Sequence, residues 1–179
     1  MTIADAALAA VGALRWMGPG ELAELRRGGS GPALWRTEAR LVAKGLVAER
    51  DLARWSPVIQ ALAILTPKGA PQDRGELHDP GRPWGRVLCD GGDPDWKPDP
   101  AAPRPAGLSE RRLAQLLAAR SEARAVLMMR AARLVAARRG ALGVHVGDLA
   151  RALLHPDAPE IVARPYYARL DGRPASPET

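Results

Sequence analysis

The chain contains no phenylalanine, and this absence limits its fold more than any other feature of the sequence. Only 4% of the residues are aromatic, so the core must be built from Leu, Val and Ala, and Ala alone occupies 34 of the 179 positions. Sheets favour β-branched and aromatic side chains, whereas Ala and Leu suit closely packed helices. The sequence therefore predicts an all-α fold.

Hydrophobic periodicity indicates where the helices of the first half lie. Pro57 falls inside one of them and would either kink that helix or start a new one. A short apolar island around Trp84 could form a further helix. The predicted helical segments are 3–16, 21–27, 33–46, 49–65 and 83–89.

The second half has clearer helix boundaries. Ser109 is a suitable N-cap, and Leu108 and Leu113 are spaced as the two residues of a hydrophobic staple. Pro165 lies within the last predicted helix, which must bend there. The predicted helices are 109–119, 121–139, 146–155 and 158–170.

Residues 66–107 separate the two halves, because they hold nine of the 17 prolines and seven of the 18 glycines. Within them, 93–105 is typical of an extended or disordered linker, in which only Trp96 could act as an anchor. The length of the chain allows one domain or two small ones sharing an interface. We expect two small helical bundles, 1–92 and 108–171, a Pro/Gly/Asp-rich linker at 93–107 and a frayed tail at 172–179.

No motif of catalysis or metal binding stands out. The single cysteine and three scattered histidines cannot supply a tetrahedral zinc site of recognisable spacing. The loop at 28–31 lacks the lysine of a phosphate-cradling loop, and no nucleophile elbow occurs. We expect no enzyme activity, no metal and no cofactor.

The cysteine count and the distribution of apolar residues indicate the cellular compartment. With one cysteine, Cys89, the chain cannot form an internal disulfide, which suits a reducing cytoplasm. Residues 1–17 do not resemble a signal peptide, and no apolar run is long enough to span a membrane. We expect a cytoplasmic protein without a membrane partner.

The net charge is +6, and it is unevenly distributed. Residues 108–151 carry nine Arg against three acids, whereas residues 73–99 carry seven acids against four bases. Arg outnumbers Lys 23 to 3, which a GC-rich genome would also produce. The separation of the two signs along the chain nevertheless favours a polyanionic partner.

Eight arginines lie between positions 111 and 139. On helices packed by their leucines we expect them to point outward and form a broad positive surface. Arginine makes planar, bidentate contacts with phosphate, and the segment has one Gln and no Asn to read bases. The surface therefore favours backbone over sequence recognition. The arginines are Arg111, Arg112, Arg120, Arg124, Arg130, Arg133, Arg138 and Arg139.

Several segments of the chain stand in an order that is typical of a known family. The most specific is Leu108-Ser109-Glu110-Arg111-Arg112-Leu113-Ala114-Gln115-Leu116-Leu117, followed by the Arg-rich helix to Arg139. The other matching stretches are Glu24-Leu25-Arg26-Arg27, Gly85-Arg86-Val87-Leu88, Val146-Gly147-Asp148-Leu149-Ala150-Arg151 and Tyr166-Tyr167. In this order the segments resemble the CasB family, the small subunit of the type I-E CRISPR Cascade surveillance complex.

The resemblance implies two small helical bundles, no catalysis and two copies within the complex. It implies that the subunit helps to hold the guide RNA–target DNA hybrid and the displaced strand, and contacts the backbone and large subunits. It carries nucleic-acid contacts to Arg27, Arg111 and Arg112, and then to Arg120 and Arg130. Arg138 and Arg139 are nucleic-acid candidates on their charge alone.

Two other functions remain open. A helix-turn-helix regulator could use 146–155 and 158–170, but Pro165 interrupts its second helix, and Glu160 and Ile161 suit base edges poorly. A protein–protein adaptor could use the arginines to dock an acidic partner.

Overall fold

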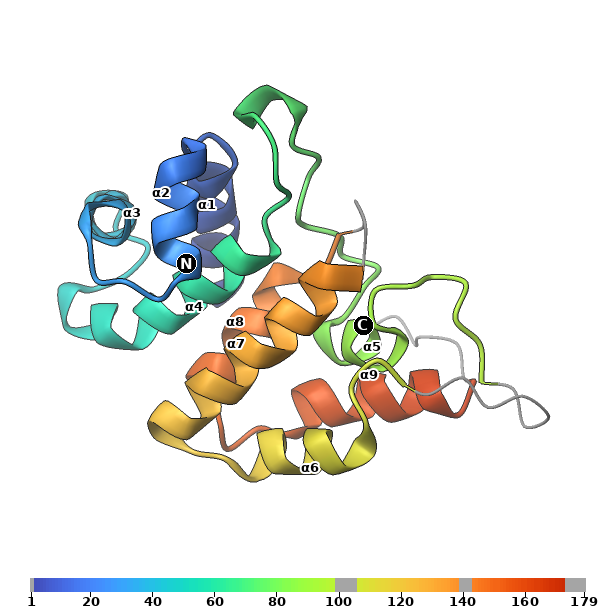
Figure 1. Cartoon of the computed structure of the whole chain (residues 1–179). Helices are drawn as coiled ribbons and strands as arrows, with labels where there is room; N and C mark the ends of the chain where they lie inside the picture. The colour runs from blue at the N-terminus through green and yellow to red at the C-terminus, as the bar shows by residue number, and fades with distance from the viewer. Residues whose placement is uncertain (1, 99–105, 139–142, 173–179) are drawn as a thin grey trace.

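The computed structural model describes residues 2–98, 106–138 and 143–172. These residues form nine α-helices and two 3₁₀ turns, and no β-strand (Figure 1). The expected all-α fold is confirmed. The helices are α1 (Ile3–Arg15), α2 (Pro19–Arg26), α3 (Pro32–Ala43), α4 (Leu52–Leu65), α5 (Trp84–Asp90), α6 (Glu110–Ala118), α7 (Ser121–Arg138), α8 (Val146–Leu154) and α9 (Glu160–Leu170), and the 3₁₀ turns are η1 (Glu49–Asp51) and η2 (Pro71–Asp73).

Local sequence signals explain several helix starts. The Thr2 hydroxyl accepts the Asp5 N–H at 3.2 Å, and the Asp5 carboxylate accepts the Thr2 N–H at 2.7 Å, which caps α1. His145 caps α8, since its Nδ1 accepts the Asp148 N–H at 3.0 Å. Ser109 occupies the N-cap of α6 as predicted, but its side chain makes no capping hydrogen bond.

The two prolines inside predicted helices do not divide them. Pro57 lies within α4, which continues to Leu65, and Pro165 lies within α9. Residues 58–65 of α4 are all buried, because α1, α2, α3, α7 and α8 pack around this helix. α4 is therefore the central helix of the fold.

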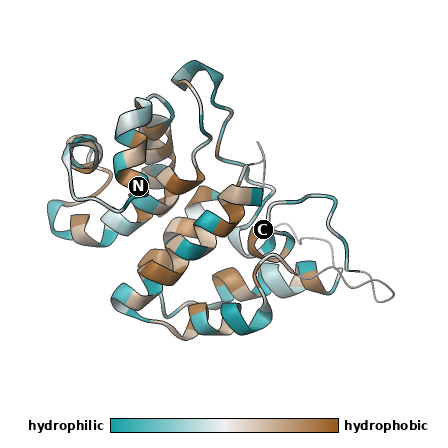
Figure 2. Cartoon of the chain, viewed as in Figure 1, coloured by the Kyte–Doolittle hydropathy of each residue, from teal (hydrophilic) through white to brown (hydrophobic). Residues whose placement is uncertain are grey.

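The helices that precede and follow residues 93–107 pack against each other. α1 lies on α8, α4 lies on α7, and α5 lies along α9. Figure 2 shows hydrophobic residues along α1, α4 and α7, whereas the loop at the top of the view is mostly hydrophilic. One cluster of buried side chains joins Leu14 and Leu62 to Val135 and Leu149. The two predicted bundles therefore share an interface, and the division of the chain into two bundles stays a prediction.

The pair α5–α9 is held by a close approach of backbones. A Cβ at Gly85 would overlap the carbonyl oxygen of Val162 and lie 3.0 Å from the Tyr166 nitrogen. The Tyr166 hydroxyl donates to the carbonyl oxygen of Leu108 at 2.6 Å. The Leu108 N–H donates in turn to the carbonyl oxygen of Leu88 in α5 at 2.8 Å. The start of α6 is thus fixed against both α5 and α9.

Trp96 anchors the first residues of the predicted linker, and the linker itself stays a prediction. Its indole is only 4% exposed, and the Arg169 guanidinium lies 5.5 Å from the ring centroid. Arg169 also donates to the carbonyl oxygens of Pro94 and Trp96. Residues 99–105 and the predicted tail from 173 onward lie outside the described residues.

A buried ionic group lies beside this anchor. Asp90 is 4% exposed, and its two carboxylate oxygens lie 3.4 Å from Arg82 Nη2 and 3.5 Å from Arg169 Nε. Burial raises the pKa of Asp90, and the Gly92 N–H and the Arg82 charge act against that rise. The Asp90 carboxylate therefore links the C-terminal end of α5 to Arg169 in α9 and to Gly92, in the segment that follows α5.

Candidate nucleic-acid interface

The start of α6 presents two arginines to solvent. Leu113 and Leu116 are buried, so the helical spacing directs Arg111 and Arg112 away from the core. Neither side chain makes a hydrogen bond or ion pair with another residue in the part of the chain that the structure describes. Glu110 is also exposed in this first turn and lowers its net positive charge.

The position of this pair suits an anion. The first turn of a helix leaves backbone N–H groups without intrahelical partners, and helical side chains lean back toward that end. Arg111 and Arg112 therefore flank a place where a phosphate would meet both guanidinium and backbone donors.

α7 presents a second set of arginines. Its buried face carries Met128, Ala132 and Val135, which leaves Arg130 and Arg133 exposed on the other side. Because these two residues are three apart, they lie on one helix face.

The end of α2 lies beside this face of α7. Arg133 Nη2 donates to the carbonyl oxygen of Arg26 at 3.2 Å, so the exposed Arg27 follows directly at the point of contact. Two segments that are about 100 residues apart in the chain thus bring Arg27 near Arg133.

Arg138 lies at the end of α7, near residues that precede α6. A Cβ at Gly91 would lie 3.6 Å from Arg138 Cδ and 3.3 Å from the Cα of Gly107. Arg138 is therefore beside the segment that leads into α6. We call Arg27, Arg130, Arg133, Arg138, Arg111 and Arg112 the basic strip; its middle helix, α7, crosses the centre of Figure 1.

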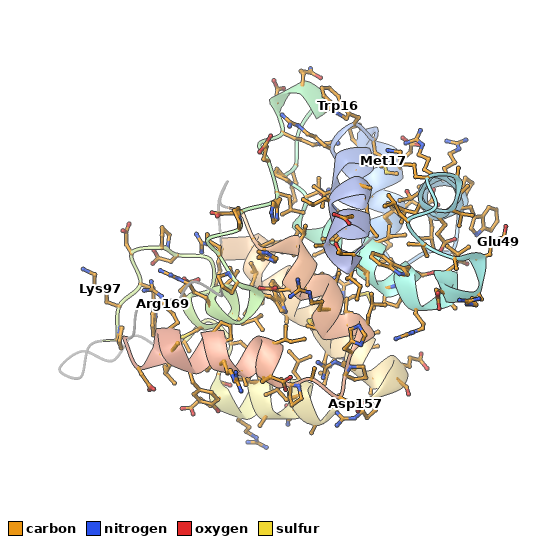
Figure 3. All side chains as sticks on the ribbon, turned by 180° about the vertical axis from the view of Figure 1, so that it is seen from behind. Trp16, Met17, Glu49, Lys97, Asp157 and Arg169 are labelled. Atoms are coloured by element: carbon orange, nitrogen blue, oxygen red, sulfur yellow. The ribbon has the colours of Figure 1, made fainter. Side chains whose placement is uncertain are left out.

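Arg120 is more engaged than these residues. Its Nη1 donates to the carbonyl oxygens of Leu117, Ala118 and Ala119, and its Nε lies 3.6 Å from a carboxylate oxygen of Asp157. Asp157 is labelled in Figure 3, on the side opposite to the view of Figure 1. A nucleic acid would have to compete with the end of α6 for Arg120. The seventh candidate, Arg139, lies outside the described residues.

Arg124 corrects the expectation that the arginines of this segment all point outward. It is 2% exposed, and its Nε donates to the Ala152 carbonyl oxygen at 2.8 Å while its Nη1 donates to that of Leu116 at 3.1 Å. Burial lowers the pKa of Arg124. The sequence held a signal for this role, because Arg124 lies four residues before the buried Met128 on the core face.

Other arginines have structural roles that the sequence analysis missed. Arg74 Nη1 donates to the carbonyl oxygens of Arg15 at 2.8 Å and Met17 at 2.7 Å, at the end of α1. Arg26 Nη2 donates to that of Thr66 at 2.8 Å at the end of α4, and Arg54 Nη2 donates to that of Leu154 at 2.6 Å at the end of α8. No local pattern marks Arg74, which lies in a loop.

Neither a metal site nor a membrane span is found among the residues that the structure describes. Within them, no three His, Cys, Asp or Glu side chains are grouped so that they could hold a metal ion. None of the described helices combines the length and apolar character that a membrane span requires.

Comparison with known proteins gives one match. The family model described as CRISPR-associated protein Cse2 matches residues 21–169. This range contains every described arginine of the basic strip. No curated protein and no solved structure matches the chain.

Proposed function

Because the chain belongs to the Cse2 family of CRISPR-associated proteins, we propose that it is the non-catalytic small subunit of a type I-E Cascade complex. In this role the basic strip binds the guide RNA–target DNA hybrid and the displaced strand through their sugar–phosphate backbones. These contacts stabilise the opened target during antiviral defence. The other partners are the backbone and large subunits and a second copy of the chain, in the cytoplasm.

The observation that supports this proposal is the contrast between two sets of arginines. Arg74 and Arg124 are buried and hydrogen-bonded to helix ends, whereas Arg111, Arg112 and Arg130 are exposed and make no ion pair with a described residue. Exposed arginines without carboxylate partners are free to bind phosphate.

Apart from its arginines, the strip has few groups with which to distinguish bases. Asn and Gln, which read adenine, are absent from its members, and the neighbouring exposed side chains of α7 include Val126 and Ala123. In the proposed complex, base pairing with the guide reads the sequence, so the contribution of the strip to affinity should be uniform across target sequences.

The helix-turn-helix alternative has less support. Its second helix would be α9, which packs along α5 and buries Val162 and Tyr166. Its exposed residues include Glu160, Arg164 and Tyr167, a face without net positive charge, which suits the major groove of DNA poorly. Binding of one particular duplex by the isolated chain would favour the alternative.

The proposal is tested by reversing two charges at the start of α6. Arg111→Glu combined with Arg112→Glu should weaken target binding by the assembled complex and leave the subunit folded, because exposed charges contribute little to folding. The slope of log K against log salt should flatten by about 0.7–0.9 for each phosphate that the variant no longer binds. Affinity is measured at several salt concentrations on two unrelated guide–target pairs.

A matched control makes the same change of charge elsewhere. Arg40→Glu combined with Lys44→Glu alters two exposed residues at the end of α3, and target affinity should stay as in the wild type. If the Arg111/Arg112 variant assembles and binds target DNA with unchanged affinity and salt slope, the site assignment is wrong.

A further inference from the structure

α3 has two apolar faces, and the fold covers only one of them. Ala33, Leu34 and Leu41 are buried against the core, while Trp35 on the other side is 59% exposed. A surface helix of a soluble protein usually carries a single apolar face. A second face with a large exposed aromatic side chain is typical of a surface that binds a partner.

The outward face of α3 is one wall of a shallow groove of about 570 Å³. Small side chains leave room beside the Trp35 indole for an inserted group, and η1 and the start of α4 form the other wall. The lining residues are Trp35, Glu38, Ala39, Val42, Ala43, Glu49 and Leu52. Val42 is half-buried in this groove, whereas its neighbour Leu41 is buried in the core.

Both charged residues of the groove are acidic. Glu38 is held in place, since the Ser56 hydroxyl donates to its carboxylate at 2.6 Å, and Glu49 is exposed at the start of η1. Neither carboxylate forms an ion pair with a described residue. In Figure 3, Glu49 lies at the edge of the molecule, far from Lys97 and Arg169.

These features define the chemistry of the occupant. Two unpaired carboxylates repel a phosphate backbone, so the groove does not suit the nucleic acid that the basic strip would bind. They attract arginine or lysine. Trp35 and Val42 offer an apolar surface to an inserted side chain, and the face of the Trp35 ring can bind a cation. We propose that this groove docks a helix or segment of a neighbouring protein subunit, with an apolar side chain flanked by Arg or Lys.

This docking proposal rests on the proposed function, because the neighbour is another protein of the complex. It adds that two separate surfaces of the subunit bind two kinds of partner. The basic strip would bind nucleic acid, and the groove on α3 would fix the subunit in the assembly.

The experiment measures how well variants join the rest of the complex, purified with its guide RNA but without this chain. Trp35→Ala should weaken incorporation about tenfold or more, as expected for an aromatic anchor. Glu49→Lys should weaken it as well, with little loss of fold because Glu49 is exposed. Trp16→Ala is the matched control, since Trp16 is 65% exposed but lies outside the groove, and it should join like the wild type.

The melting temperature of each variant and its affinity for random-sequence single-stranded DNA are measured in parallel. Both should match the wild type. If Trp35→Ala and Glu49→Lys join the complex as the wild type does, the proposal is overturned. Lower affinity of Trp35→Ala for the DNA would assign the groove to nucleic acid instead. Dissociation of a wild-type dimer by Trp35→Ala in sedimentation would assign it to a second copy.

If the wild-type chain itself does not join the complex, the proposed function fails, and the docking proposal fails with it. If only the docking proposal fails, the experiments give a different combination of results. The wild type and both groove variants would then join equally, while the Arg111/Arg112 variant would still have a reduced target affinity.

Discussion

Arginine side chains donate to backbone carbonyl oxygens at the C-terminal ends of five of the described helices. The carbonyl groups of a last helical turn have no intrahelical partner, and the negative end of the helix dipole favours a cation there. Arg124 serves two ends at once, with Leu116 of α6 and Ala152 of α8 as acceptors. The other capping residues are Arg26, Arg54, Arg74, Arg120 and Arg133.

Buried and exposed arginines of α7 should contribute differently to stability. Arg124→Ala removes the donors of two buried carbonyl groups, so it should lower the free energy of unfolding by about 1–3 kcal/mol. Arg130→Ala, on the exposed face of the same helix, should change it by less than about 0.5 kcal/mol. Urea unfolding followed by circular dichroism checks both values. Equal losses in the two variants would mean that the hydrogen bonds of Arg124 do not stabilise the fold.

At the scale of elements, the contact of α5 with α9 depends on the lack of a side chain at one position. Gly85 faces the backbone of Val162 and Tyr166, where a methyl group has no room. Gly12 in α1 is a helical glycine without this constraint, because a Cβ there meets nothing within 4 Å. The two positions allow the same substitution to be compared in opposite environments.

Gly85→Ala should push α5 away from α9 and destabilise the protein by about 1–3 kcal/mol, the usual cost of overpacking. Gly12→Ala should be neutral or stabilise it by about 0.5–1 kcal/mol, since alanine is the better helix former. Differential scanning calorimetry measures both changes. A melting temperature for Gly85→Ala at or above that of the wild type would show that the helices can separate without loss.

At the scale of the whole molecule, the packing of α1 on α8 and of α4 on α7 links the two predicted bundles. The approach is close, since a Cβ at Gly147 in α8 would lie 3.1 Å from the Cβ of Ala4 in α1. Apolar surface buried between two units couples their unfolding.

We therefore expect one cooperative unfolding transition for the whole chain. The fluorescence of the buried Trp55 and Trp84, which come from different parts of the fold, should change together with the helical circular dichroism signal in urea. Variants that keep only Trp55 or only Trp84 allow the fluorescence change of each tryptophan to be measured separately. Two distinct midpoints would show that the chain does not unfold as one unit.

Much of this fold could be predicted from the sequence, because its helices follow local signals such as Pro19, Pro32 and the spacing of Leu113 and Leu116. The exposure of Arg111 and Arg112 followed from the same spacing. The role of Arg74 could not be predicted, since its acceptors lie nearly 60 residues away in the chain. The anchoring of Trp96 by Arg169 is equally non-local.

The arginine caps have a practical consequence for handling the protein. Hydrogen bonds from Arg74 and Arg124 to buried carbonyl groups are shielded from solvent ions, so added salt screens them little. Contacts between an exposed arginine and phosphate weaken steeply as salt is added. Concentrated salt should therefore strip bound nucleic acid from the protein during purification without unfolding it. The ionic strength of the buffer then controls occupancy and leaves conformation unchanged.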